Sequence, residues 1–420
     1  MSVTPPPVPI EESAPRRRAA LLQPFRSQDF RLLWSGLLVS NLGTWMQLTT
    51  LGYIVVKLAG GARVAALDVG ILGASAAIPV VLLSPFGGVV ADRISRRSVL
   101  FATNGLEVAV ALALALLATF HRLGLGEIYS LSALRAAGQS FDAPARQSWV
   151  PLLVSREHLG TAIGLNSVAF NAPSVIGPPI AGFLIAAVGI AASFYINAVA
   201  TLAVVLALVL MKPAPPSSTV REGMLASMRA GFGFLFRHAV LRSVLLLLVA
   251  ISLLVRPYGQ LLPAYAAHVV HVGATGLGFL LAASGAGAIV GSFVTALVRE
   301  RNRAIVWFAS ALMMAAGTIG LGFTDSYPVA LAALVVIGLA VLSFAGSSNV
   351  LLQSLSPEDL RGRSVAAFSM IILGGIPLGS LVLGTLASAV GLPAALIAGG
   401  TAALGCAGVL WWRTPALRGA

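Results

Sequence analysis

The chain has 420 residues, of which 58% are hydrophobic and only 10% are charged. An average soluble domain has about 45 to 50% apolar and about 25% charged residues, so this composition excludes a soluble protein and predicts many membrane spans. The formal net charge of +13 does not indicate nucleic-acid binding, because the basic residues lie in short loops beside apolar runs. The single cysteine, Cys406, excludes an intrachain disulfide and a cysteine-based metal cluster.

The amino-terminal 29 residues are predicted to form a disordered cytoplasmic tail and a short entry segment. The first 20 residues are rich in proline, and the basic triplet at 16–18 is not followed by the apolar core of a signal peptide.

Twelve stretches each contain about 20 apolar residues, the length that a helix needs to cross a bilayer. They are long and continuously apolar, whereas barrel strands are short and alternate in polarity. The sequence therefore predicts an all-α membrane protein with twelve transmembrane helices. The predicted spans are residues 31–57, 67–90, 98–120, 127–150, 161–187, 190–211, 243–266, 273–298, 304–323, 327–352, 364–388 and 391–412.

A dense charge cluster separates the second and third spans, in the stretch Gly88-Val-Val-Ala-Asp92-Arg93-Ile-Ser95-Arg96-Arg97. Three arginines within five residues must lie in water, on the side of the membrane where basic loops are retained. Most other Lys and Arg residues fall in loops on that same side, which predicts that both termini are cytoplasmic.

The same cluster is a candidate inner gate. The Asp92 carboxylate can meet the positive amino-terminal end of the eleventh span near Arg363, an interaction of about 0.3 to 1 kcal/mol. Such a latch biases a two-state equilibrium without freezing it. The alternative is that the cluster only sets the topology. We assign to this gate Gly88, Asp92, Arg93, Arg96, Arg97 and Arg363.

Charges inside the spans are scarce, and each costs at least about 2.5 to 3.5 kcal/mol at the bilayer centre unless it faces protein or water. Glu107 in the third span and Arg135 in the fourth lie at similar depths near the middle of the membrane. We expect them to take part in proton coupling, with Glu107 as the titrating carboxylate; the alternative is a static ion pair. Asp142 is expected to pair with Arg146, four residues further on.

Polar and aromatic residues in the first and seventh spans are candidates for the lining of a substrate cavity. They are Asn41, Trp45 and Gln47, and then Arg256, Tyr258 and Gln260 beside a helix-breaking proline. With Arg135 and Arg256 set against Glu107, the midplane would be net positive, which favours an anionic or polyphenolic substrate over a cationic one.

An internal repeat divides the chain into two halves. Gly177, Gly182 and Gly189 recur at Gly379, Gly384 and Gly391, an offset of 202 residues. This spacing predicts two parallel six-helix bundles with a pathway between them. The bundles are residues 30–211 and 243–413, joined by a cytoplasmic linker at 212–242 that contains an amphipathic helix, and residues 414–420 form a second tail.

These features together resemble the major facilitator superfamily of secondary transporters over residues 25–413. The 88–97 loop is similar to the loop between helices 2 and 3 of that superfamily, with Ser95 where a glycine is usual. Two further motifs, Pro24-Phe25-Arg26-x-x-Asp29-Phe30-Arg31-x-Leu33-Trp34 and Phe141-Asp142-Ala-Pro144-Ala-Arg146, are similar to the branch of the enterobactin exporter and macrolide efflux pumps.

The resemblance also bears on direction and coupling. Gly177-Pro178-Pro179-Ile-Ala-Gly182 is similar to the antiporter sequence of the superfamily, which implies export; the alternative is mere close packing. Arg135 is similar to the superfamily's fourth-helix arginine, which is linked to proton coupling.

The predicted function is a secondary active exporter of a small amphipathic molecule, siderophore or drug-like, that works by alternating access against protons. The alternatives are an uptake permease of the same fold and a non-transporting receptor. Motifs for an enzyme or an ATP-driven pump are absent from the sequence. We expect a monomer in the plasma membrane, surrounded by lipid, with no cofactor, nucleic acid or metal; His268 and His271 share a helical spacing but lack a third ligand.

Overall fold

The computed structural model describes residues 23–211, 238–357 and 360–418, and every regular element within them is a helix. A first group of helices contains η1 (Gln23–Arg26), α2 (Gln28–Leu58), α3 (Ala62–Arg93), α4 (Arg96–Thr119), α5 (Leu125–Trp149), η2 (Val150–Leu152), η3 (Arg156–His158), α6 (Leu159–Ala187) and α7 (Ile190–Leu210). A second group contains α9 (Ala239–Leu254), α10 (Tyr258–His268), α11 (Ala274–Leu297), η4 (Glu300–Asn302), α12 (Arg303–Phe323), α13 (Tyr327–Ser354), α14 (Arg361–Val390), α15 (Leu392–Arg413) and η5 (Pro415–Arg418).

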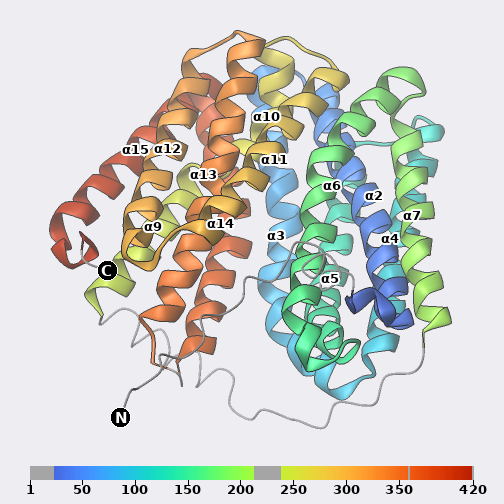
Figure 1. The fold of residues 1–420 in the computed structure, drawn as a ribbon. Coiled ribbons are helices and arrows are strands. Elements are labelled where there is room, and N and C mark those ends of the chain that lie inside the picture. The colour runs from blue at the N-terminus through green and yellow to red at the C-terminus, as the bar shows by residue number, and fades with distance from the viewer. Residues whose placement is uncertain (1–22, 212–237, 358–359, 419–420) are drawn as a thin grey trace, which may run out of the picture.

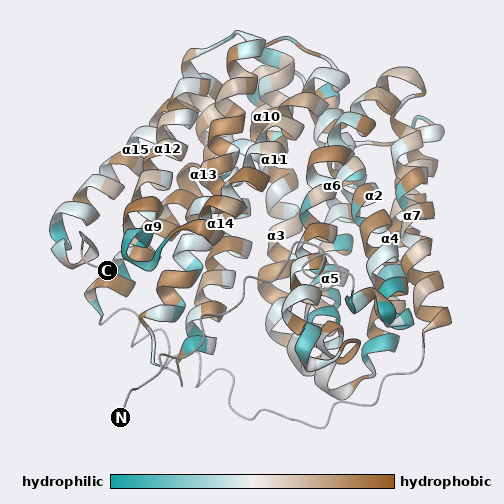
Figure 2. Ribbon diagram, in the orientation of Figure 1, coloured by the Kyte–Doolittle hydropathy of each residue, from teal (hydrophilic) through white to brown (hydrophobic). Residues whose placement is uncertain are grey.

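Ten helical segments of the described chain are long and apolar enough to cross a membrane. Helices α9 and α10 count as one of these segments, and α2 and α5 are not among the ten, although they are equally long. Figure 2 shows hydrophobic residues through the middle of the helices and hydrophilic residues gathered toward the end where α2 begins and α7 ends. A helix satisfies all its own backbone hydrogen bonds, as an apolar surrounding requires.

The helices of each group pack mainly against one another (Figure 1). In the first group α2 contacts α6 and α7, and α3 contacts α5; in the second group α11 contacts α13, and α12 contacts α13 and α15. Trp149 and Trp307 are each almost completely buried, one in each group. We call the end of the helices where α2 ends and α11 begins the distal end, and the end where α2 begins and α11 ends the proximal end (Figure 1).

The two groups meet mainly along two crossings, α3 with α14 and α6 with α11, at which glycine brings the backbones into contact. A Cβ on Gly278 of α11 would lie 2.6 Å from the Pro178 carbonyl oxygen, and one on Gly70 of α3 would lie 2.7 Å from that of Ser380. Pro178 and Ser380 are separated by the 202 residues of the sequence repeat. The two crossings are therefore equivalent by that repeat, and both lie toward the distal end.

The seventh predicted span is broken rather than continuous, which corrects the single helix expected at 243–266. Helix α9 ends at Leu254 and α10 begins at Tyr258. Pro257 cannot donate the backbone hydrogen bond that would continue the helix. Gly379 of α14 packs against the break, where its Cβ would lie 2.4 Å from the Leu253 carbonyl oxygen.

Other boundaries differ by a few residues. Helix α2 begins at Gln28, where Ser27 accepts a hydrogen bond from the Phe30 amide as its cap, and α9 begins at Ala239, inside the expected linker. The amphipathic helix expected in the linker falls almost wholly at 212–237, outside the described residues. The departure from the superfamily pattern at Ser95 has a local use, because its hydroxyl caps α4 by accepting the Ser98 amide hydrogen.

Candidate functional site

The two charged residues predicted near the middle of the membrane lie together in the first group of helices. Arg135 Nη1 of α5 is 3.8 Å from Glu107 Oε1 of α4, and the side chains are only 6% and 13% exposed, respectively. At this distance the charges attract without a direct hydrogen bond. Arg135 Nε and Nη1 have no hydrogen-bond partner among the described residues, so the guanidinium keeps free donors beside the carboxylate.

A third helix also contacts the Glu107 carboxylate. Asn197 Nδ2 of α7 donates to Gln47 Oε1 of α2 at 2.8 Å and to Glu107 Oε1 at 3.4 Å. Asn197 and Gln47 are almost completely buried. Four helices thus meet at one buried polar cluster of Gln47, Glu107, Arg135 and Asn197, which we call the midplane cluster.

A second charged pair lies on the proximal side of the midplane cluster. Asp142 Oδ2 is 3.2 Å from Arg146 Nη2, which confirms the ion pair expected from their spacing. Asp142 Oδ1 also accepts hydrogen bonds from Thr103 and Asn104 of α4, each at 3.2 Å. The Arg146 guanidinium lies 4.4 Å from the centroid of the Phe170 ring, close enough for a cation–π contact.

A narrow polar cavity of about 70 Å³ connects the two charged groups. Asn41, predicted to line a cavity, does so here, and its amide also donates to the Ala169 carbonyl at 3.1 Å. The lining comes from four helices and comprises Leu37, Ser40, Asn41, Thr44, Thr103, Asn104, Glu107, Gly138, Gln139, Asp142, Arg146 and Phe170. A water molecule occupies about 30 Å³, so this volume suits about two waters and not a drug-like ligand.

The net positive charge expected at the midplane is not found around this cavity. Its lining contributes Glu107, Asp142 and Arg146, and Arg135 lies directly behind Glu107. The negative charges of the two carboxylates and the positive charges of the two guanidinium groups cancel. Sequence reasoning paired Asp142 with Arg146 and did not count it with Glu107.

The remaining predicted cavity residues lie elsewhere. Trp45 packs against Gly177, where a Cβ on the glycine would lie 2.8 Å from the Trp45 Cβ. Tyr258 is buried in the second group, and its hydroxyl is 2.7 Å from Ser284 Oγ. Arg256 is partly buried in the break between α9 and α10, and Gln260 is exposed on α10. The structure therefore does not bring these residues into the polar cavity of the first group.

The predicted export motif lies at the crossing of α6 and α11. Gly177 faces α2 inside the first group, whereas Pro178 and Gly182 face the second group. A Cβ on Gly182 would lie 2.5 Å from the Ala274 carbonyl oxygen, and Thr275 Oγ1 donates to the Gly182 carbonyl at 3.4 Å. The motif thus contributes directly to the contact between the two groups.

The predicted inner gate is described only in part. The side chains of Asp92 and Arg93 lie outside the described structure, although α3 runs past Gly88 to end at Arg93. Arg97 Nη2 donates to the Val209 carbonyl at 3.1 Å, which ties the proximal ends of α4 and α7 together. Arg96 begins α4, and Arg363 lies in the first turn of α14, as expected for the eleventh span.

Sequence reasoning missed Asn197, the residue that joins Gln47 to Glu107. The available signal was an amide side chain in the otherwise apolar stretch 190–210, where polar side chains are expected to face protein. It also missed Asp68, which is 8% exposed on α3 and whose Oδ2 has no hydrogen-bond partner among the described residues.

Solved structures identify the class of protein that this fold defines. A bacterial homologue of the human lysosomal transporter Spinster, in an inward-facing and occupied conformation, superposes with a TM-score of 0.74 at 14% sequence identity, covering 93% of this chain and 97% of that one. A POT family transporter superposes with a TM-score of 0.73 at 13% identity, covering 93% and 96%. The chain has the fold of these multi-pass membrane transporters.

The family follows from the sequence comparison. The model of a major facilitator family described as transmembrane secretion effector matches residues 19–418, and the chain belongs to that family. The enterobactin exporter EntS of Shigella boydii serotype 18 is 30% identical over 309 residues, covering 71% of this chain and 72% of its own. The multidrug efflux pump Tap of Mycolicibacterium fortuitum is 25% identical over 372 residues, covering 86% and 90%. The chain is a transporter and not an enzyme.

Proposed function

We propose that this transporter exports a small amphipathic molecule, siderophore or drug-like, in exchange for protons. The observation that carries the proposal is the placement of the Glu107 carboxylate, which touches Arg135 on one side and a cavity of water dimensions on the other. The relatives named for export of enterobactin and for multidrug efflux support the direction.

The proposed architecture is twelve spans in two six-helix bundles, 30–211 and 243–413, with α2 and α5 also crossing the membrane. Their lower apolarity has a physical reason, because they carry Gln47, Arg135, Asp142 and Arg146 toward the bundle interior. The proximal end, with its basic loops and both termini, is assigned to the cytoplasm of a cell bounded by a plasma membrane. The transporter acts as a monomer.

The glycine crossings support an inward-facing state. Both crossings bring backbone against backbone toward the distal end, which is the outer side in this orientation. One of the superposed transporters is itself named as inward-facing. Alternating access then requires the two crossings to separate while the proximal ends close, with the Asp92 latch against α14 as the inner contact.

Proton exchange follows from the geometry of the midplane cluster. A carboxylate can gain and lose a proton, whereas arginine remains charged. When Glu107 is ionised it attracts Arg135, and when it is protonated this attraction is lost, so that the guanidinium can turn to a substrate or to water. The polar cavity past Asn104 and Asp142 gives the proton a route to the proximal end in the inward-facing state.

The test is Glu107→Gln in inverted membrane vesicles with a fluorescent efflux dye added outside, so that export appears as uptake into the vesicles. We expect uptake driven by a pH gradient to fall at least about 100-fold, the lower end of the range for loss of an essential proton-transfer group. Glu127→Gln is the matched control, because Glu127 caps α5 at its distal start by accepting the Gly124 amide hydrogen and glutamine preserves such a cap.

Undiminished gradient-driven uptake by the Glu107→Gln protein would contradict the coupling role. Accumulation only in right-side-out vesicles would instead contradict export and favour an uptake permease.

A further inference from the structure

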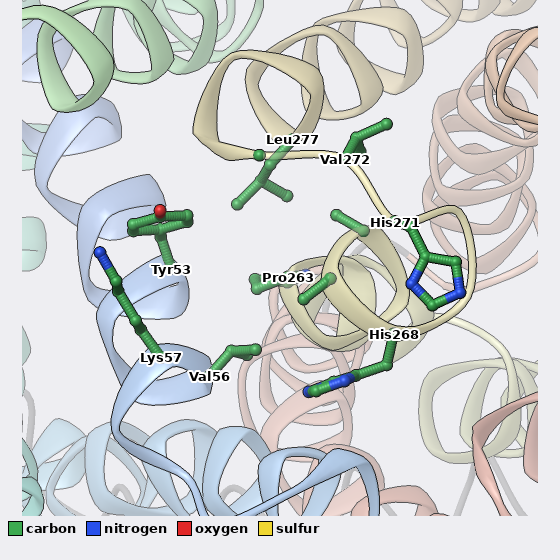
Figure 3. A pocket seen from close by; sticks show the side chains of 11 residues that line it. Tyr53, Val56, Lys57, Pro263, His268, His271, Val272 and Leu277 are labelled. Atoms are coloured by element: carbon green, nitrogen blue, oxygen red, sulfur yellow. The ribbon is translucent and has the colours of Figure 1, made fainter.

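A cavity of about 410 Å³ lies at the distal end, separate from the polar cavity of the first group (Figure 3). Ligand sites commonly have volumes of about 300 to 1,000 Å³, so this space is large enough for a small organic molecule. One wall comes from α2, and the others come from α10, the turn after it and α11. The lining residues are Tyr53, Val56, Lys57, Pro263, Ala266, Ala267, His268, His271, Val272, Gly273 and Leu277.

The walls of this distal cavity belong to both groups of helices. Gly52 of α2 packs so closely on α10 that a Cβ there would lie 2.6 Å from Pro263 Cγ. Helices α2 and α10 therefore touch beneath the cavity, and a ligand in it contacts both groups at once.

The lining is mostly apolar, with basic and aromatic side chains among its residues. Lys57, His268 and His271 are its ionisable nitrogen groups, and none of the lining residues is acidic. The Lys57 ammonium lies 5.8 Å from the centroid of the Tyr53 ring, so the two form one cationic and aromatic wall. Figure 3 shows the His268 ring extending from α10 toward the α2 side, whereas His271 lies on the opposite side of α10 from Lys57.

His268 presents an unsatisfied polar atom at this wall. Its Nε2 is buried and has no hydrogen-bond partner in the part of the chain that the structure describes. Buried polar atoms in folded proteins are almost always paired, so an orphan atom beside a cavity marks a place for a ligand or water atom. An imidazole nitrogen that carries hydrogen can donate to an anionic oxygen.

His271 shows why the two histidines are not one metal-binding face. Helix α10 ends at His268, and His271 follows in the left-handed region at φ = 52°. The helical spacing read from the sequence is therefore lost, and the wall acts through Lys57 and His268.

We propose that the distal cavity binds an amphipathic aromatic anion. Its ring packs on Tyr53, Val272 and Leu277, and its acidic group is held by the Lys57 ammonium and His268 Nε2. Because both groups of helices contribute walls, the bound anion stabilises the state in which the distal ends are together. If the distal end is the outer side, as the proposed function holds, anion accumulating outside slows export.

The first experiment uses the full-length chain with Cys406→Ser and Val272→Cys in lipid nanodiscs, where both faces are accessible. Cys406 is exposed and is removed so that the maleimide reacts only with the thiol introduced at position 272. The rate of modification by a charged maleimide is measured against 1-naphthalenesulfonate, with 1-naphthylmethylammonium as a probe of the same ring and opposite charge. We expect the sulfonate to slow modification to saturation and the ammonium ion to have no effect.

The second set of variants assigns the contacts. Lys57→Gln and His268→Leu should each weaken protection by the sulfonate about tenfold, which corresponds to loss of one charge-assisted contact. Arg122→Gln is the control, because Arg122 is an exposed distal cation that is not on the lining. Lys57 is exposed, so its substitution leaves the packing intact.

Equal protection by the ammonium ion, or unchanged protection in both variants, would overturn the site. Binding in nanodiscs does not depend on orientation, so its failure is distinct from failure of the export proposal. If the sulfonate binds in nanodiscs but does not slow dye export when added outside cells, the proposed inhibition of export by external anion is wrong.

Discussion

Glu107 has two partners of different kinds. Arg135 is charged and makes no hydrogen bond with it, whereas the neutral amide of Asn197 donates a hydrogen bond to it. The Arg135 guanidinium is 3.8 Å away with unpaired donors, whereas Asn197 bridges Glu107 to Gln47. A buried charge left without its partner is costly, because the desolvation penalty is then no longer offset by the attraction between the two charges. The midplane cluster thus has a structural role beside the coupling role that we propose for it.

Removing one member of the pair should therefore cost more than removing both charges. Arg135→Leu is expected to lower the free energy of unfolding by about 3 kcal/mol, since Glu107 is left buried beside an apolar group. Glu107→Gln combined with Arg135→Leu should recover about 1 kcal/mol or more of that loss. Equilibrium unfolding in mixed micelles measures both, with exposed Arg122→Leu as a control that changes little; additive effects would mean the two charges do not interact.

The helices are arranged by glycines at the contacts between elements. Within a membrane, helices associate through close packing rather than through the hydrophobic effect, so small residues decide which faces meet. At the α3 with α14 and α6 with α11 crossings a methyl group would overlap a backbone carbonyl. These positions hold the distal ends together and do not contribute to the stability of a state in which those ends are apart.

A methyl group at Gly278 should therefore shift the conformational equilibrium rather than unfold the protein. Overpacking costs about 1 to 3 kcal/mol, and here it burdens only the distally closed state, so the population ratio should change roughly 5- to 150-fold. Spin labels are attached at Leu58→Cys and His271→Cys in a Cys406→Ser background. The distance between the two labels should be longer in the Gly278→Ala protein. It should also be longer in the Gly70→Ala protein, because Gly70 lies at the crossing that the repeat makes equivalent. Gly405→Ala, where no atom lies within 4 Å of the added Cβ, should match the parent.

The whole molecule has one end rich in basic loops and another with few charges, and this asymmetry fixes its orientation in our proposal. Ser95 at the start of α4 is exposed at the proximal end, and His121 after α4 is exposed at the distal end. They lie at opposite ends of one membrane-length helix.

Single cysteines at these two positions should react from opposite sides of the membrane. In intact cells carrying Cys406→Ser, an impermeant maleimide is expected to modify His121→Cys and to spare Ser95→Cys, because the membrane blocks access to the proximal end. Permeabilised cells, in which both should react, provide the control. Modification of Ser95→Cys from outside would reverse the orientation and with it the cytoplasmic placement of the termini.

Sequence alone determined the helical class, the helix positions within a few residues except at the break in the seventh, and the Asp142 with Arg146 pair, because these depend on local apolar length and on i, i+4 spacing. It also located Glu107 and Arg135 at one depth. Only the tertiary structure decided that Asn197 completes their cluster, that Trp45 packs on Gly177, and that Lys57 and His268 face a shared cavity. The reason is physical: a helix that is apolar on every side carries no sequence signal for which face meets which neighbour, so rotation is set by close packing between helices.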